Sequence, residues 1–165
     1  MKSWMENEGA ARICEYLTEI QGIGFDQIEE DIVTLTGLVG VTTLTNPDEY
    51  TVQVGFDFYV YALSGYIQDV GEPGGWANFT RLQFNIQDSK QLKNMFGQAV
   101  NMGALLRTTG PHTIYFQPPY KKFESSSQLN LTWSRLTTGG TFQAPDVNVG
   151  VTLHGMKVKR QPQGG

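Results

Sequence analysis

The chain has 165 residues, enough for one domain with a sizeable core, and its 19 glycines and 12% aromatic residues favour short strands over disorder. The single Cys14 excludes an internal disulfide framework and a standard cysteine zinc site, and the two histidines lie far apart, so we expect no metal and no cofactor. The net charge of −4 and the dispersed basic residues argue against nucleic acid as a partner, and no apolar run is long enough to suggest a membrane span.

The modest net charge conceals a division along the chain. Residues 1–72 carry 13 acidic residues against Lys2 and Arg12, a balance of −11, whereas residues 73–165 have a balance of +7. Such a division has two interpretations. The two halves of one sandwich attract each other, or opposite poles dock onto a partner or onto copies of the same chain.

Residues 1–21 are predicted to form a partly helical N-terminal arm. Ser3 and Glu6 have the spacing of a capping box at a helix start. Apolar residues follow at helical spacing, and Gly22 and Gly24 end the pattern. The apolar stripe must be buried against the domain itself or against another chain. Its members are Ala10, Ile13, Cys14, Leu17 and Ile20.

The next segments have the patterns of β-strands. Residues 31–45 are rich in Val, Leu and Thr and predict one or two short strands, followed by a turn at 46–48. Residues 50–62 alternate strictly and predict one long strand, and residues 80–87 predict another half-buried strand.

The second half of the chain continues this pattern around one irregular segment. Residues 89–109 lack period two and predict a long structured loop, with a short helix as the alternative. Short strands are predicted at 113–117, where Pro118 and Pro119 end the strand, and at 129–133.

The terminal strand, 147–158, has the clearest alternation in the chain. Its apolar row changes parity at His154 and Gly155, which predicts a β-bulge within this strand, with a glycine conformation at Gly155. We expect its partners among the strands at 50–62, 80–87 and 129–133.

Seven or eight strands of this kind predict an all-β fold, an antiparallel β-sandwich of jelly-roll type with the partly helical N-terminal arm. The expected organisation is an arm at residues 1–21, a sandwich domain at 22–160 and a flexible tail at 161–165.

No catalytic constellation is recognisable in the sequence. His154 alternates onto the polar face of its strand, and the adjacent acids Glu29, Glu30 and Asp31 diverge from one another, so we predict that the chain is not an enzyme. Aromatic residues at polar positions are more suggestive, because such rings stack on sugars and concentrate at protein interfaces. They are Tyr59, Tyr61, Tyr66, Trp76, Tyr115 and Tyr120.

Three stretches carry a resemblance to a known group: Thr80–Ser89, the passage Met102–Pro119, and the terminal Val151–Val158 with its Leu-His-Gly-Met-Lys-Val sequence. Over residues 79–158 the chain resembles small β-sandwich proteins encoded among the virion structural genes of tailed bacteriophages, in which a late Leu-His-Gly-x-Lys-Val strand closes the domain. The resemblance implies a structural protein of the phage head or neck without enzymatic activity.

The leading hypothesis is therefore a capsid cement or decoration protein that binds the major capsid protein and copies of itself, located in the virion and assembled in the host cytoplasm. A head–tail connector or tail protein and a carbohydrate-binding sandwich for host attachment are the alternatives, and an enzyme whose site the sequence does not advertise is a third. We predict a homo-oligomer. The candidate partner interface consists of Trp4, Ile13, Leu17, Ile20, Trp76, Phe96, Leu105 and Leu106.

Overall fold

The computed structural model describes residues 7–39, 49–67, 82–107, 110–135 and 147–161. The strands within them are β1 (Ile28–Val39), β2 (Glu49–Thr51), β3 (Phe56–Ile67), β4 (Leu82–Asp88), β5 (Lys93–Asn94), β6 (Val100–Asn101), β7 (Leu106–Arg107), β8 (Gly110–Pro111), β9 (Thr113–Tyr115), β10 (Lys121–Phe123), β11 (Gln128–Arg135) and β12 (Val147–Lys159). The helical elements are α1 (Glu8–Glu15), a π-helical turn η2 (Tyr16–Ile20), and the 3₁₀ turns η3 (Phe25–Gln27) and η5 (Met102–Ala104).

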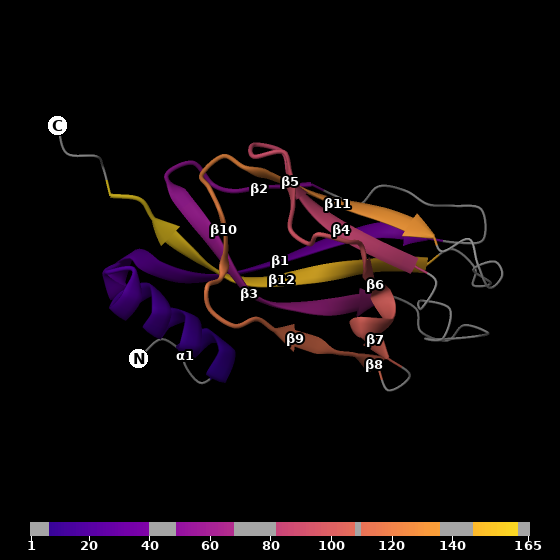
Figure 1. The fold of residues 1–165 in the computed structure, drawn as a ribbon, viewed down its shortest axis with the longest axis horizontal. Coiled ribbons are helices and arrows are strands. Elements are labelled where there is room, and N and C mark those ends of the chain that lie inside the picture. Colours follow the sequence, from indigo (N-terminus) through magenta and orange to yellow (C-terminus); the bar gives the residue numbers. More distant parts are fainter. Residues whose placement is uncertain (1–6, 40–48, 68–81, 108–109, 136–146, 162–165) are drawn as a thin grey trace.

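The described strands form a jelly roll (Figure 1). Sheet A has the order β1-β12-β3-β10 with β9 also on β3, and sheet B has the order β2-β11-β4-β5 with β6 also on β4. The first strand thus pairs with the last, β2 with β11, β3 with β9 and β10, and β4 with β5 and β6, all antiparallel. This is the pattern of one long hairpin rolled up into two sheets, so the predicted all-β sandwich of jelly-roll type is confirmed.

The space between the two sheets is filled by apolar side chains. Leu82, Phe84 and Ile86 of β4 and Leu129, Leu131 and Trp133 of β11 alternate inward as predicted. From sheet A they meet Phe58, Val60 and Leu63 of β3 and Val149, Val151 and Leu153 of β12. Burying this many apolar side chains is the main force that holds the sheets together, at roughly 1.5–3 kcal/mol for each fully buried large side chain.

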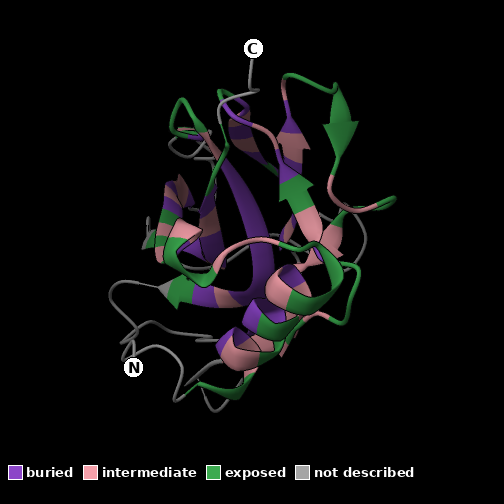
Figure 2. Ribbon diagram, turned by 90° about the vertical axis from the view of Figure 1, so that its left-hand side faces the viewer, coloured by how far each residue is buried: buried purple, intermediate pink, exposed green. Residues whose placement is uncertain are grey.

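A second apolar cluster lies on the outer face of sheet A, beneath the helix. Asn7 caps α1 by accepting hydrogen bonds from the amides of Gly9 (2.9 Å) and Ala10 (3.2 Å). The predicted apolar stripe of the helix is buried against the chain's own sheet except for its last member, Ile20, which is exposed, and Figure 2 shows the buried side of the helix turned toward the strands. The cluster joins Ala10, Ile13, Cys14 and Leu17 to Ile28, Tyr59, Tyr61, Ala62, Tyr120, Met156 and Val158. The predicted capping box at Ser3 and Glu6 and the predicted tail beyond 161 lie outside the described residues.

The terminal strand follows its predicted alternation, and a bulge does occur at the predicted residues His154 and Gly155, but its extra residue belongs to the neighbouring strand β3 and not to β12. The register of β12 against β1 runs through twelve consecutive pairs without interruption. Its apolar row changes parity because Val149, Val151 and Leu153 face the core between the sheets, whereas Met156 and Val158 face the helix. The ladder to β3 does shift between His154 and Gly155, and the extra residue there is Tyr61 of β3.

The predicted single strand at 50–62 is two strands in different sheets. Tyr50 belongs to β2, which pairs with β11 in sheet B, and Phe58 belongs to β3 in sheet A. A turn at Val54 and Gly55, where Gly55 has φ of +86°, takes the chain from one sheet to the other. The alternation continues through this corner because even-numbered residues of both strands, such as Tyr50 and Phe58, face the shared core.

The remaining predicted segments differ little from the structure. Residues 89–107 form the predicted structured loop, with only β5, β6, β7 and the short turn η5 as regular elements. Of the one or two strands predicted at 31–45, the described part belongs to β1, which begins earlier, at Ile28, and extends to Val39. Residues 40–45 and the predicted turn at 46–48 are outside the described residues. Within the part of the chain described here, no helix is long and apolar enough to cross a membrane.

Candidate functional site

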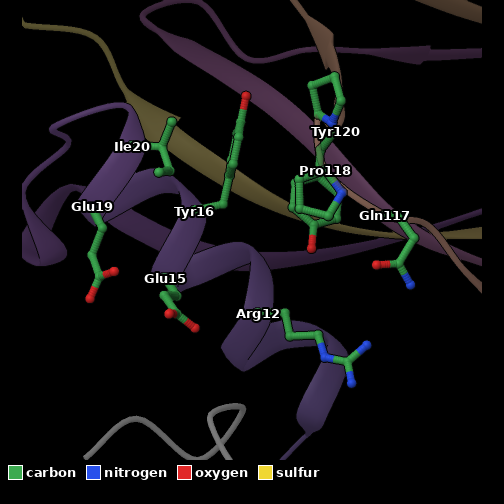
Figure 3. A pocket seen from close by; sticks show the side chains of 9 residues that line it. Arg12, Glu15, Tyr16, Glu19, Ile20, Gln117, Pro118 and Tyr120 are labelled. Atoms are coloured by element: carbon green, nitrogen blue, oxygen red, sulfur yellow. The ribbon is translucent and has the colours of Figure 1, made fainter.

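A groove runs along the exposed side of the helix, between η2 and the segment that joins β9 to β10 (Figure 3). Its volume is about 590 Å³. Tyr16 stands on one side of it, and Pro118 and Tyr120 stand opposite. The full lining is Arg12, Glu15, Tyr16, Glu19, Ile20, Gln117, Pro118, Pro119 and Tyr120.

The groove exists because the strand opposite β3 is interrupted. Tyr115 of β9 pairs with Ala62, and Lys121 of β10 pairs with Val60, so residues 116–120 lie opposite the single bulged residue Tyr61. Proline has no amide proton to donate to a ladder, so Pro118 and Pro119 leave the sheet at this point. The excursion forms one wall, and the exposed side of the helix forms the other.

Two tyrosines form the apolar floor. The rings of Tyr16 and Tyr120 pack edge to face, with centroids 5.3 Å apart. Tyr120 is almost wholly buried, and burial raises the pKa of its hydroxyl, so the group stays protonated and able to donate a hydrogen bond. On the open side, Ile20 is 70% exposed.

A smaller hollow of about 240 Å³ adjoins the groove and shares Arg12 and Tyr120 with it. Its other lining residues are Asn7, Glu8, Gly9, Tyr115 and Phe116. Together the two hollows extend along the helix from its first turn to its last. The combined surface has a shape that suits an extended polypeptide segment better than a compact small molecule.

The rim of this surface is acidic. Arg12 forms an exposed ion pair with Glu8 at 2.6 Å, one turn apart, and Glu15 and Glu19 add two further carboxylates in the same spacing. Like charges at this spacing destabilise a helix by a few tenths of a kcal/mol. An aromatic floor with a negative rim is suited to apolar side chains and to Lys or Arg side chains, which are attracted to carboxylates and ring faces.

A serine and a histidine also lie within hydrogen-bond distance on the outer face of sheet A. Ser64 Oγ is 2.8 Å from His154 Nε2, and burial lowers the pKa of the imidazole. Nucleophilic catalysis further requires a group that orients the base and donors that stabilise an oxyanion. Ser64 pairs with Thr152 in the ladder, so its contact with His154 is a diagonal cross-strand hydrogen bond, and this structural role accounts for it.

The buried Asp57 is the centre of a structural ion cluster. Its Oδ1 accepts hydrogen bonds from the Ser125 amide (3.0 Å) and Arg160 Nε (2.8 Å), and Lys122 Nζ lies 3.6 Å from its Oδ2. These contacts join the end of β12 to β3 and β10. Among the described residues, no group of three or more His, Cys, Asp or Glu side chains is placed to hold a metal ion.

The residues predicted as a partner interface are scattered in the structure. Four of them, Ile13, Leu17, Leu105 and Leu106, are buried in the two cores, so a partner could reach them only by displacing parts of the fold. Phe96 is half-buried against Phe84 and Phe116. Ile20 alone among the described members lies exposed, at the groove, and Trp4 and Trp76 are outside the described residues.

The aromatic residues singled out from the sequence also divide. Tyr59 and Tyr61, expected on an exposed face, are buried beneath the helix, whereas Tyr66 and Tyr115 are exposed. The sequence did not single out Tyr16, because it falls beside the predicted apolar stripe. The signal that could have found the groove is Pro118-Pro119-Tyr120 directly after a predicted strand.

A scan against protein-family models gives no match for this chain. A search of curated proteins likewise finds no similar sequence.

Proposed function

We propose that the protein is a non-enzymatic structural protein of a tailed-phage virion, a cement or decoration protein that binds the major capsid protein on the head. The sequence resemblance over residues 79–158 suggests this class. Jelly rolls occur in viral capsid proteins, lectins and cupins, so the fold is compatible with the proposal without selecting it.

The observation that carries the proposal is the filled interior of the jelly roll. Ligand-binding sandwiches and barrels keep a cavity between their walls, whereas here large apolar side chains such as Phe58, Phe84 and Phe123 occupy that space with almost no exposure. A rigid body with a packed interior and its main groove on the outside suits a protein that works by surface contact.

The groove along the helix is the proposed contact with the capsid protein. Exposed Ile20 and the tyrosine pair resemble the apolar and aromatic anchors that dominate protein interfaces. Many copies on a symmetric shell add their contacts, so even a shallow groove is sufficient for tight decoration.

The test is co-sedimentation of the purified full chain with shells assembled from the major capsid protein. We expect the wild type to bind and Ile20→Glu to weaken binding by about tenfold, as for a buried interface anchor. Val54→Glu is the matched control, because Val54 is equally exposed but lies outside the groove. A wild type that stays in solution would contradict the proposed function, and equal binding by all three proteins would contradict the role of the groove.

A glycan on the host surface is a second candidate ligand for the same groove. The favouring observation is the combination of two tyrosines with the polar side chains of Arg12, Glu15 and Gln117 around one hollow. A glycan array probed with the wild type and with Tyr16→Ala tests it. Binding that Tyr16→Ala abolishes would support this candidate, and an array without signal would remove it.

A further inference from the structure

The outer edges of the two sheets differ sharply in length. Apart from β1, the strands at the edges are β2, β5, β6, β9 and β10, each two or three residues long. β1 has twelve residues, and among the described strands it pairs with β12 on one side only. Short edge strands protect a sheet from joining another chain, and β1 lacks this protection.

Apart from its acidic residues, the described β1 also lacks most of the other features that block edge pairing. Its sequence contains no Lys, Arg or Pro, and its register with β12 has no bulge. Its acidic residues, Glu29–Asp31, are confined to the first third, and the stretch Ile32–Gly37 is uncharged. Within that stretch Thr34 is exposed and Ile32 is 52% exposed.

We propose that the β1 edge pairs antiparallel with β1 of a second copy of this chain, across a two-fold axis at Thr34. Thr34 then lies opposite Thr34 of the other copy, Ile32 opposite Thr36, and Asp31 opposite Gly37. The segment Asp31–Gly37 is therefore complementary to itself, as an isologous contact requires.

The charge pattern favours an antiparallel pairing whose centre lies away from the acidic residues. In the antiparallel register centred on Thr34, each carboxylate of Asp31 faces an uncharged glycine. A parallel pairing would align the acids Glu29–Asp31 of one copy with those of the other, and like charges directly opposite each other are destabilising. A register centred on Asp31 would place two carboxylates on the axis.

The side chains also match across this axis. A two-fold axis perpendicular to sheet A keeps the faces aligned, so Val33 and Leu35 continue the inner face of both copies. Ile32 and Thr34 meet their partners on the outer face, and Ile32 loses much of its exposure. Sheet A becomes one continuous sheet through two molecules.

A contact of seven residues per strand is small in comparison with stable interfaces, which bury about 1,200 Å² or more in total. The isolated dimer is accordingly weak and forms at high protein concentration, whereas copies held side by side on a larger assembly would pair readily. The contact goes beyond the proposed function, since it needs only a second copy and no capsid.

Single cysteine variants of the full chain test the register. Opposed residues of antiparallel strands have Cα atoms about 4.5–5.5 Å apart, within the range that a disulfide spans. We expect Thr34→Cys to form a disulfide-linked dimer on mild oxidation at high concentration. Thr36→Cys should remain monomeric, because its two copies would lie roughly 13 Å apart along the strands. The native Cys14 is buried, and the wild type gives the background.

The two outcomes are decisive for the register. Cross-linking of Thr34→Cys alone, together with cross-linking between mixed Ile32→Cys and Thr36→Cys chains, would establish it. Equal cross-linking of Thr34→Cys and Thr36→Cys, or none above the wild-type background, would overturn it.

A charge exchange provides a second, independent measurement. Thr34→Lys and Thr34→Glu each place like charges on the axis, so each alone should sediment as a monomer at concentrations where the wild type dimerises. An equimolar mixture should regain the dimer. Ser134→Lys, an exposed strand residue of sheet B, is the control and should behave as the wild type. Dimerisation of both single variants, or a wild type that remains monomeric at every concentration, would contradict the proposal.

Discussion

Gly155 offers the most direct test of how sheet A is packed. The structure places it on the inner face of β12, and a Cβ added there would lie 2.5 Å from the carbonyl oxygen of Tyr59 and 2.6 Å from Cζ of Phe58, with Cε2 of the same ring closer still. Ordinary van der Waals contacts of a Cβ are at 3.4–4 Å, so alanine requires a shift of nearly 1 Å in a densely packed core.

Overpacking of this kind costs about 1–3 kcal/mol, and two of the three close atoms belong to a fully buried ring while the third is backbone, which favours the upper end. Replacing glycine returns about 0.4–1 kcal/mol by restricting the unfolded chain. We therefore expect Gly155→Ala to lower the free energy of unfolding by about 2 kcal/mol, equivalent to a fall in Tm of roughly 4–8 °C for a domain of this size.

Urea denaturation and thermal unfolding measure this loss. Gly97→Ala is the matched control, since a Cβ at Gly97 meets nothing within 4 Å, and its stability should be unchanged or slightly higher. Phe58→Leu should reduce the cost of Gly155→Ala, because the two changes share one contact. Full wild-type stability of Gly155→Ala would refute the close packing described here.

Three further predictions concern the helix, the ion cluster and the histidine. Leu17→Ala should lower stability by about 2–5 kcal/mol in urea denaturation, because Leu17 is fully buried beneath the helix; a loss below 1 kcal/mol would mean that the helix contributes little. Asp57→Asn should cost about 1–3 kcal/mol by thermal unfolding, whereas Glu8→Gln in the exposed pair with Arg12 should stay within about 0.5 kcal/mol; equal effects would contradict the burial of the Asp57 cluster. Burial lowers the pKa of His154 in the folded state, so protonation of this histidine favours the unfolded chain. The free energy of unfolding is therefore highest above the unfolded pKa of about 6.5 and decreases as the pH falls. The wild type should therefore lose more stability than His154→Gln between pH 7.5 and 5.5, and parallel losses would exclude this effect.

The sequence predicted the strands well wherever one face packs against the apolar core and the other carries polar side chains. β4 and β11 alternate cleanly for this reason, and their residues carry the pattern by themselves. Alternation does not reveal which sheet a strand joins. Residues 50–62 therefore looked like one strand, because the turn at Gly55 changes the sheet without changing the parity.

The apolar parity change at His154 and Gly155 shows a second limit of periodicity. A bulge and a change of covering layer produce the same sequence pattern, and only the position of the helix over Met156 and Val158 distinguishes them. The helix stripe is similar, since Ile13 and Leu17 are as apolar as any interface residue. Their partners in β12 lie more than a hundred residues away, which no local pattern can identify.

The groove could be predicted only in fragments. Tyr16 and Tyr120 are separated by about a hundred residues and meet because a bulge in β3 faces the proline segment. The charge division along the chain was visible in the sequence. Its acidic part supplies the rim of the groove, and whether it also serves docking stays a prediction.

The rolled hairpin also determines when the protein can fold during synthesis. Ile28 pairs with Val158, so the ladder between β1 and β12 closes only after the 130 residues that follow Ile28 have been made. At roughly 5–20 residues per second, β1 waits on the order of ten seconds for its partner. During that time both of its edges are available to β1 of a neighbouring nascent chain on the same messenger RNA. Translation from closely spaced ribosomes should therefore favour mispaired aggregates, and slower initiation should raise the soluble yield.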